Sequence, residues 1–260
     1  MVKPKFEKLA FMASTRPSAQ EAMEELVSIY GNVEAAEADA IIPLGGDGFM
    51  LETLRRFLPL VTAGLPVYGM NKGTVGFLMN KYVSDELIQR LENATPTPVH
   101  PLSMTAEAAS GTFTDIAFNE VSVFRQSQQA AHIRVSVDGK ERLERLVADG
   151  VMLSTPVGST AYNLSAHGPV IPLGADILAL TPISAFRPRR WRGALLSGHA
   201  KVRFDVLNPE KRPVSASADN SEIQDLISIE ISQDEDTTLT LLFDEDHGLA
   251  EKILQEQFAT

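Results

Sequence analysis

The most constraining feature of this chain is a change of sequence pattern near residue 95. Before it, short apolar segments alternate with amphipathic helical segments, and after it apolar and polar residues alternate over long stretches. The first pattern is typical of a parallel sheet covered by helices, and the second is typical of antiparallel strands. Thr95-Pro96-Thr97-Pro98 lies at the change and has the composition of a linker. We therefore expect an α/β N-terminal domain followed by a β-rich C-terminal domain.

The N-terminal part predicts strands and helices in strict alternation. The predicted elements are strand 8–13, helix 18–30, strand 40–44, helix 49–57, strand 65–70 and helix 84–91. Ser18, with Glu21 three residues later, has the form of a capping box that satisfies free amides at a helix start. Gly31 is a natural stop for this helix. Strands that are joined by helices lie parallel in one sheet, so we expect a parallel sheet here.

Beyond residue 98 the pattern predicts mostly antiparallel strands. The alternating segments are 113–124, 131–137, 143–153, 200–207 and 226–243. Asp138-Gly139 predicts a hairpin between two of them, because a tight hairpin turn needs residues that tolerate positive φ. Residues 247–258 return to helical periodicity. The expected division is an α/β domain over 1–95, a β-rich domain over 96–245 and a C-terminal tail over 246–260.

The charge balance restricts the partners that this chain attracts. It has 23 basic and 34 acidic residues, which gives a formal net charge of −11. Nucleic acids and anionic membranes bind cationic surfaces, so we expect neither as a partner. A phosphate-bearing substrate would have to be held locally, by backbone amides, a few cations or a metal ion.

Cysteine content and apolar runs bear on the compartment. The chain has no cysteine, which excludes disulfides and thiolate ligands and fits a reducing environment. The first residues lack the form of a secretory signal, and no stretch of about 18 apolar residues predicts a membrane span. We therefore expect a cytoplasmic protein.

The first segment that carries chemistry is Gly45-Gly46-Asp47-Gly48, between an apolar strand and the next helix. Glycines let a backbone approach a phosphate closely, and a helix start offers unpaired amides to an anion. A carboxylate would repel that anion, so Asp47 makes sense as a base that takes a proton from a substrate hydroxyl, or as a metal contact. The alternative is a tight turn in which Asp47 bonds its own backbone.

Three further segments have polar patterns that fit ligand binding. They are Asn71-Lys72-Gly73-Thr74-Val75-Gly76-Phe77, Phe118-Asn119-Glu120-Val121 and the run from Asp149 to Pro169. The first follows a strand, as the G-G-D-G loop does, so both loops would lie at the same edge of a parallel sheet. An amide beside a carboxylate suits a base and a ribose, and hydroxyl residues at a helix start suit a ligand's polar edge. Taken alone, each segment is also compatible with an ordinary loop, strand end or capped turn.

Together, these segments resemble the NAD kinase (ATP-NAD kinase) family. Its motifs occur here in the same order between residues 45 and 169, as G-G-D-G, N-x-G-x-x-G-F, N-E and D-G…S-T-P-x-G-S-T-A-Y-x-x-S-x-x-G-P. The G-G-D-G loop is shared with lipid kinases of the diacylglycerol kinase type and with phosphofructokinases, whereas the S-T-P…S-T-A-Y run is much more specific. The resemblance implies a Rossmann-like parallel sheet in the α/β domain, a β-rich second domain, and a C-terminal tail that returns to pack on the first domain.

The resemblance also implies an activity, the transfer of a phosphoryl group from ATP to the 2′-hydroxyl of the adenosine ribose of NAD, which gives NADP. Asp47 matches the family's general base, and Gly46 and Gly48 match its phosphate-facing glycines. Asn119 and Glu120 match the pair that holds adenosine or ribose groups. The other positions implied at the substrate site are Phe77, Thr160, Ala161, Tyr162, Asn163 and Ser165.

Asp149 matches the family carboxylate that reaches the nicotinamide, often from a neighbouring subunit. It stands at a strand junction where we expect few cations nearby, which would leave it available to a ligand. The resemblance thus implies a homodimer or homotetramer with shared sites. It also implies a divalent metal, magnesium or manganese, that acts with ATP, although no residue is assigned as its ligand.

Several positions depart from the family pattern. They are Phe49, Val157, His167 and the Asp219-Asn220 pair. Phe49 and His167 add bulk near the expected site, but none of these changes removes a proposed catalytic group. Two other functions stay open from the sequence, a lipid kinase that shares the G-G-D-G loop and a dinucleotide-binding protein without catalysis.

Overall fold

The computed structural model describes residues 5–73 and 76–245 of the 260-residue chain. The chain divides into two compact units, which we call unit 1 and unit 2. Unit 2 comprises His100–Asp236, and unit 1 comprises the residues before and after it. Unit 1 is therefore built from both ends of the sequence. No helix within the described ranges is long and apolar enough to cross a membrane.

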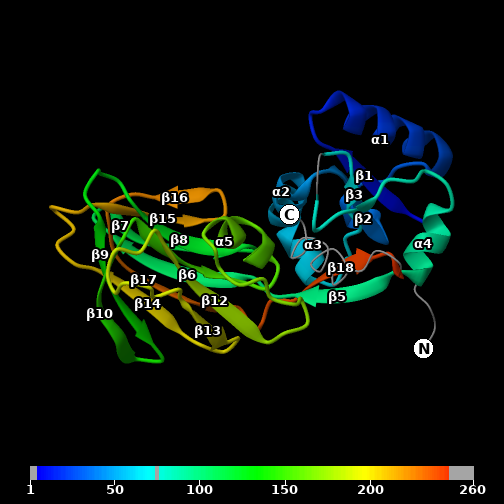
Figure 1. The fold of residues 1–260 in the computed structure, drawn as a ribbon. Coiled ribbons are helices and arrows are strands. Elements are labelled where there is room, and N and C mark those ends of the chain that lie inside the picture. The colour runs from blue at the N-terminus through cyan, green and yellow to red at the C-terminus, as the bar shows by residue number, and fades with distance from the viewer. Residues whose placement is uncertain (1–4, 74–75, 246–260) are drawn as a thin grey trace. The chain divides into compact units, whose positions relative to one another are not determined.

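Unit 1 contains a parallel sheet with helices, as the sequence predicts. Its elements are β1 (Leu9–Ala13), α1 (Pro17–Tyr30), a 3-10 turn (Ala35–Glu37), β2 (Ala40–Gly45), α2 (Asp47–Arg56), α3 (Leu58–Thr62), β3 (Met70–Asn71), β4 (Asn80–Lys81), α4 (Leu87–Asn93), β5 (Thr95–Val99) and β18 (Leu239–Phe243). Strands β1 to β4 pair in sequence order, and each pair is parallel (Figure 1). Their carboxyl ends therefore lie at one edge of the sheet.

Helices cover the sheet because its central strand is apolar on both faces. Every residue of β2 is buried. Its alternate residues Ala40, Ile42 and Leu44 share a core cluster with α1 and α4, so Ile41 points to the opposite face, because strand side chains alternate. Helix α2 packs on β2 as well. A strand that is buried on both faces reads as a continuous apolar run, which is what the sequence shows.

Residues 95–98 form a strand, so the prediction of a linker there was wrong. Strand β5 pairs antiparallel with β18, with Leu239 opposite Val99 and Phe243 opposite Thr95. Val67 bridges both Ile41 in β2 and Leu241 in β18, which joins this pair to the parallel sheet. Prolines are tolerated at the edge of a sheet, where a missing amide leaves no ladder bond unmade. The predicted helical segment 247–258 lies outside the described residues.

Three other local predictions differ from the structure. Helix α1 begins at Pro17, and Ser18 makes no capping bond, because proline's fixed φ suits the first helical position. The predicted strand 65–70 is reduced to the Val67 bridge and to β3. Helix α4 begins at Leu87 rather than at residue 84, after Glu86 in the left-handed region (φ 56°).

Unit 2 is built almost entirely from antiparallel strands in two sheets. Its strands are β6 (Leu102–Ala108), β7 (Gly111–Ala117), β8 (Glu120–Arg125), β9 (Ala131–Val137), β10 (Lys140–Ala148), β11 (Gly150–Ser154), β12 (Ile177–Ile183), β13 (Ala194–Ser197), β14 (Val202–Val206), β15 (Val214–Ala218), β16 (Ser221–Ile223) and β17 (Leu226–Gln233). One sheet has the order β10-β9-β14-β17-β6-β7, and the other has the order β13-β12-β11-β8-β15-β16. A 3-10 turn (Gly158–Thr160) and the short helix α5 (Tyr162–Ser165) follow β11.

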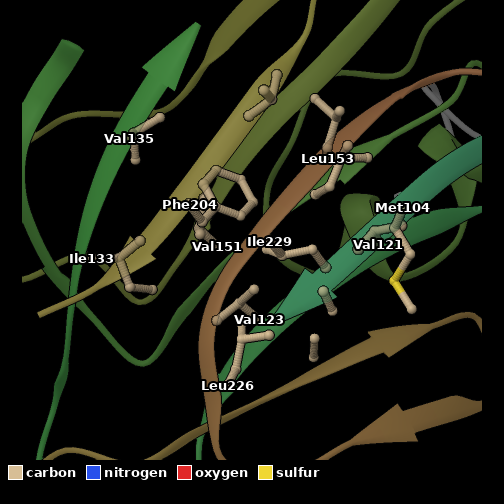
Figure 2. Close-up of a cluster of buried hydrophobic side chains, with 14 of the residues drawn as sticks. Met104, Val121, Val123, Ile133, Val135, Val151, Leu153, Phe204, Leu226 and Ile229 are labelled. Atoms are coloured by element: carbon tan, nitrogen blue, oxygen red, sulfur yellow. The ribbon is translucent and has the colours of Figure 1, made fainter. Parts of the chain in front are cut away.

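The core of unit 2 is formed by the inner faces of the two sheets. Figure 2 shows Ile133 and Val135 of β9 and Phe204 of β14 in one cluster with Val121 and Val151 of the other sheet. Alternation along β9 is strict, with every second residue buried, as a half-buried strand requires. The Asp138-Gly139 hairpin between β9 and β10 is confirmed, and both turn residues have positive φ.

Candidate active site

Asp47 lies in unit 1 at the first turn of α2, directly after the carboxyl end of β2. Its Oδ2 accepts the Phe77 amide at 2.8 Å, and its Oδ1 accepts the Leu78 amide at 2.9 Å. These two bonds join residues that are 30 and 31 positions apart in the chain. They are therefore not the bonds of a tight turn in which Asp47 binds its own backbone, which was the alternative interpretation. The second glycine-rich loop thus orients the carboxylate of the first.

Gly76 is required by this arrangement. A Cβ added at Gly76 would lie 3.1 Å from Asp47 Oδ1 and 2.9 Å from Cγ of Met79. The loop backbone can approach the carboxylate closely only because residue 76 has no side chain. Phe77 contributes its amide to this site, and the side chain is half-buried.

A polar cavity of about 610 Å³ opens beside Asp47. Its lining residues are Met12, Ala13, Ser14, Thr15, Arg16, Gly46, Asp47, Gly48, Phe49, Glu52, Arg56 and Gly73. A Cβ added at Gly46 or at Gly48 would meet no atom within 4 Å. These two glycines therefore leave open space in front of the backbone at the start of α2, which is where an anion can meet helix amides.

Asn119 and Glu120 lie in unit 2 at the start of β8, where Asp219 organises the backbone. The Asp219 carboxylate accepts the amides of Phe118 (2.8 Å), Asn119 (2.9 Å) and Glu120 (3.4 Å). Asp219 itself has φ 50°, in the left-handed region that glycine favours. Asp219, the aspartate that this chain keeps from the family's D-G pair, thus has a clear structural task.

Glu120 is held in an unfavourable environment for a carboxylate. Its Oε2 is buried and makes no hydrogen bond within the part of the chain that the structure describes. Burial, and secondarily the negative charge of Asp219, raise the pKa of Glu120 to about 7. A buried polar atom without a hydrogen-bond partner is costly in a folded protein.

The Ser/Thr-rich loop after β11 packs directly on the Asn119 backbone. The Thr155 hydroxyl donates to the Phe118 carbonyl at 2.7 Å and accepts the Gly158 amide at 3.0 Å. A Cβ at Gly158 would lie 2.1 Å from the Asn119 carbonyl oxygen, so only glycine fits. The N-E pair and the S-T-P-x-G-S-T-A-Y run, far apart in sequence, therefore form one site in unit 2.

Within that run, the side chains divide into outer and inner ones. Thr160, Ala161, Tyr162 and Ser165 all keep exposed surface. Asn163 is fully buried, and its amide donates to the Ser159 and Pro169 carbonyls and accepts the Thr181 hydroxyl at 2.6 Å. Asn163 thus braces the loop from inside.

Tyr162 connects the loop electrostatically to the other predicted residues. Its pKa is raised by burial first, and then by the negative charges of Glu120 and Asp149. Glu120 and Asp149 themselves lie toward opposite ends of the β8–β11 pairing, since Ser154 is opposite Glu120 and Gly150 is opposite Phe124.

Asp149 has a cation beside it, which corrects the expectation that few are nearby. The Arg125 Nε donates to Asp149 Oδ1 at 2.6 Å, and the Arg125 amide donates to the Asp149 carbonyl at 2.9 Å. Both side chains are about one-third exposed. Arg125 lies 24 residues earlier in the chain, so only the pairing of β8 with β11 brings the two together.

Sequence reasoning missed several residues around these sites. They are Ser14, Arg16 and Arg56 at the unit 1 cavity, and Arg125 in unit 2. The signal for Ser14 and Arg16 was their position after the first predicted strand, at the same edge as both glycine loops. His167, which replaces a usual glycine, has φ 62° and thus takes the backbone conformation that explains the glycine. The arginines at 187, 189, 190 and 192 are all exposed.

The chain has a parallel sheet, and a glycine loop that carries a carboxylate lies at the carboxyl edge of this sheet. A β sandwich with a polar loop follows it in the sequence. Together these features define a nucleotide-binding kinase of the G-G-D-G class. Residues 118–236 match the family model described as ATP-NAD kinase C-terminal domain. The NAD kinase of Caulobacter vibrioides is 54% identical over 253 residues, which cover 97% of this chain and 96% of the relative. The chain belongs to the NAD kinase family.

Two solved structures have the same fold. The yeast NADH kinase complexed with NADH matches with a TM-score of 0.81 and 21% identity, over 98% of this chain and 89% of the yeast chain. An NAD kinase from Archaeoglobus fulgidus in complex with ATP matches with a TM-score of 0.75 and 24% identity, over 95% and 98% of the two chains. These matches confirm the expected fold class, and neither the lipid-kinase nor the non-catalytic alternative is favoured.

Proposed function

We propose that this chain phosphorylates the 2′-hydroxyl of the adenosine ribose of NAD with ATP, giving NADP and ADP, and that Asp47 is its general base. Asp47 takes the hydroxyl proton while the ribose oxygen bonds to the γ-phosphorus and the bond to the ADP oxygen breaks. The observation that carries this proposal is the Asp47 carboxylate, fixed by two amides beside a polar cavity. A carboxylate oxygen can accept more than one hydrogen bond, so the two amides do not by themselves prevent Asp47 from taking the substrate proton.

We place the acceptor nucleotide in unit 2, and the chemistry of the surface around Glu120 supports this. Glu120 offers a buried acceptor to a ribose hydroxyl, and Asn119 offers an amide that both donates and accepts. Tyr162 presents an aromatic face beside the base, with Thr160, Ala161 and Ser165 around it. Asn163 acts indirectly, because it holds the loop that carries these residues.

A divalent cation, magnesium or manganese, fits this chain as a companion of ATP. Among the described residues there is no cluster of three or more His, Cys, Asp or Glu side chains of the kind that cages a metal. Magnesium is commonly held by substrate phosphates with one or two carboxylates. Glu52 lines the cavity beside Asp47 and would be such a carboxylate. When bound, the ion neutralises charge on the phosphates.

The direct test of the proposed function is incubation with Mg-ATP and NAD, followed by detection of NADP. We expect NADP to form, to vanish when EDTA is added, and to return with excess magnesium or manganese. Diacylglycerol offered in place of NAD is the control acceptor and should stay unmodified. Absence of NADP from folded protein at high substrate concentration would refute the proposal, and activity in fully chelated buffer would refute its metal requirement.

We also propose that sites are shared in a homodimer or homotetramer, through Asp149 and the nicotinamide of a neighbour's ligand. In this proposal Arg125 orients the carboxylate, of which one oxygen is engaged by the guanidinium. Mixing inactive Asp47→Asn chains with weakly binding Asp149→Asn chains should restore activity above either parent, because hybrid assemblies then contain an intact site. No recovery despite demonstrated subunit exchange would mean that each chain builds its site alone.

A further inference from the structure

Lys72 and Tyr82 form a side-chain pair that the proposed mechanism does not use. Lys72 directly follows β3, and Tyr82 directly follows β4. These two strands pair in parallel, with Asn71 opposite Lys81, so the register brings the two following residues opposite each other. The Lys72 Nζ atom lies 3.3 Å from the centroid of the Tyr82 ring, which is the geometry of a cation–π interaction.

This pair flanks the segment that holds Asp47. Residues 73–81 lie between Lys72 and Tyr82, and this segment donates the two backbone amides that the Asp47 carboxylate accepts. The Lys72 amide donates to the Gly45 carbonyl at 2.7 Å, at the end of β2. The segment is therefore tied to β2 by a backbone bond where it begins, and its beginning is tied to its end by the two side chains.

Helix α1 fixes the Tyr82 side of the pair through Glu25. The Tyr82 hydroxyl donates to Glu25 Oε2 at 2.7 Å. Hydrogen bonds from Ser84 and then from Tyr82 lower the pKa of Glu25, and the charge of Lys72 adds to this. Burial, and then the hydrogen bond to Glu25, raise the pKa of Tyr82, so the phenol keeps its proton at neutral pH. Tyr82 thus contacts α1 with its hydroxyl and Lys72 with its ring.

Lys72 is the cation of the second glycine-rich loop, so a contact with a substrate phosphate is the obvious alternative role. Its position favours another role. Among the described residues, those that line the cavity beside Asp47 do not include Lys72. Its ammonium lies over the Tyr82 ring, and its charge acts on Glu25 of α1. The cation is therefore engaged with the side chains that support the loop.

We propose that Lys72 and Tyr82 are positioning residues, which close the segment 73–81 so that its amides keep the Asp47 carboxylate in the orientation for proton transfer. The effect on catalysis rests on the proposed function, whereas the closure of the segment does not. Both residues act on the reaction through Asp47 and not through a contact with substrate. Catalytic groups must be held closely to their productive geometry, and small displacements far from the chemistry lower the rate strongly.

The first test compares disruptive and conservative variants of the pair in the full chain. Tyr82→Leu and Lys72→Met should each lower kcat by about 5- to 30-fold and leave KM for ATP and for NAD within about twofold, because alignment is lost and binding is not. Lys72→Arg should retain most of the parent's kcat, because arginine also stacks on an aromatic ring. Tyr82→Phe keeps the ring and should lower kcat by less than about threefold.

The double variant Lys72→Met/Tyr82→Leu distinguishes a shared contact from separate roles. Both substitutions remove the same interaction, so kcat of the double variant should lie within about twofold of the lower single variant. If Lys72 instead bound a substrate phosphate, Lys72→Met would raise KM for ATP, Tyr82→Leu would not, and the two losses would multiply. That result would overturn the inference.

Tyr30→Phe is the structural control. The Tyr30 hydroxyl also reaches from α1 to the chain after β4, where it donates to the Ser84 carbonyl at 2.8 Å and accepts the Leu87 amide at 3.2 Å. Its loss should lower the melting temperature, because these bonds join α1 to α4, and should leave kcat within about twofold. An equal loss of kcat in Tyr30→Phe and Tyr82→Leu would show that any loosening of this region lowers the rate, which contradicts a specific role of the pair.

Amide hydrogen exchange measures the closure of the segment without any activity. The Phe77 and Leu78 amides should exchange about 10-fold faster in Tyr82→Leu than in the parent, and at the parent's rate in Tyr30→Phe, because only the first variant releases their bonds to Asp47. If the parent makes no NADP, the proposed function fails, whereas the exchange rates still test the closure. If the parent makes NADP and Tyr82→Leu leaves either kcat or the exchange of these two amides unchanged, this inference is overturned.

Discussion

The two units hold their candidate carboxylates by opposite means. In unit 1, Asp47 receives two backbone amides and borders an open cavity. In unit 2, Glu120 has a buried oxygen with no partner among the described residues and lies near a second carboxylate, Asp219. The first arrangement stabilises negative charge, and the second disfavours it. The two carboxyl groups therefore stand in opposite electrostatic environments.

The largest predicted effect is a loss of kcat when the charge of Asp47 is removed. We expect Asp47→Asn to lower kcat by about 10²- to 10⁴-fold with little change in KM for NAD, because a positioned base typically contributes that factor. Asp39→Asn is the matched control, because Asp39 also accepts two backbone amides, of Glu7 and Lys8, each at 2.8 Å. Steady-state rates should separate the two variants. Similar losses in both would mean that Asp47 acts only as a structural acceptor.

The next largest effect is expected at Asp244, which directly follows β18 in unit 1. Asp244 accepts the Tyr68 hydroxyl and an Arg90 Nη2 donor, each at 2.6 Å, and both charged side chains are more than four-fifths buried. Asp244→Ala leaves Arg90 buried without its partner, which should lower the stability of unit 1 by about 3 kcal/mol. Hydrogen exchange should accelerate in β5 and β18 while β9 and β14 stay protected.

The control for this variant is Asp205→Ala in unit 2. Asp205 pairs with Arg203, whose side chain is 45% exposed, so its loss should cost less than about 1 kcal/mol. If Asp244→Ala and Asp205→Ala have equal effects, or if exchange accelerates equally in both units, the pairing of β18 does not control the stability of unit 1.

A smaller effect is expected where the unit 2 loop packs on the N-E pair. Gly158→Ala forces a Cβ against the Asn119 carbonyl oxygen, which should reduce the free energy of unfolding by about 1–3 kcal/mol. It should also raise KM for NAD, since Asn119 is displaced. Gly174→Ala is the control, because a Cβ there meets no atom within 4 Å. The melting temperature and the KM for NAD should be measured on both variants. Equal values in Gly158→Ala and Gly174→Ala would refute the packing argument.

A pH dependence of stability from Glu120 is expected to be similar in size to the effect of Gly158→Ala. Its pKa in the folded chain, about 7, lies above the ordinary value of 4.5. Between these values the folded state binds more protons than the unfolded state, so the free energy of unfolding falls as pH rises and then levels off above about pH 7. Glu120→Gln should remove this slope, worth about 1–3 kcal/mol.

The readout for Glu120 is denaturant unfolding at about pH 5 and about pH 8, with Glu230→Gln as the control. Glu230 is an exposed carboxylate on β17 of the same unit. Its removal should leave the slope of the parent intact. A parent without any slope in this range, or a slope that survives Glu120→Gln, would show that the carboxyl is not strained in the folded chain.

Sequence reasoning succeeded where a signal is local. The apolar run of β2, the strict alternation of β9 and the Asp138-Gly139 turn each follow from neighbouring residues, and the structure confirms them. The motifs also located their own loops, because glycine and hydroxyl residues mark the ends of strands. Whether the individual residues bind substrate stays a prediction.

It failed where a contact joins distant segments. Thr95–Val99 became a strand because Leu239–Phe243 returns to pair with it, which no local pattern reveals. Arg125 meets Asp149 only through the pairing of β8 with β11, and Asp219 reaches the Glu120 amide from 99 residues away. Such contacts decide which charges lie around each site. The electrostatic environment of the sites was therefore the property that the sequence predicted least well.

The bridge from Val67 to Leu241 also sets an order of events during synthesis. Unit 2 is one continuous stretch, so all of its strands are synthesised before β18. The sheet of unit 1 stays incomplete, with β5 unpaired and one side of the Val67 position open, until β18 has been made. A polypeptide that stops short of Leu239 would therefore carry a finished sandwich beside a half-built sheet with an exposed edge, and such edges are where chains pair with one another by mistake.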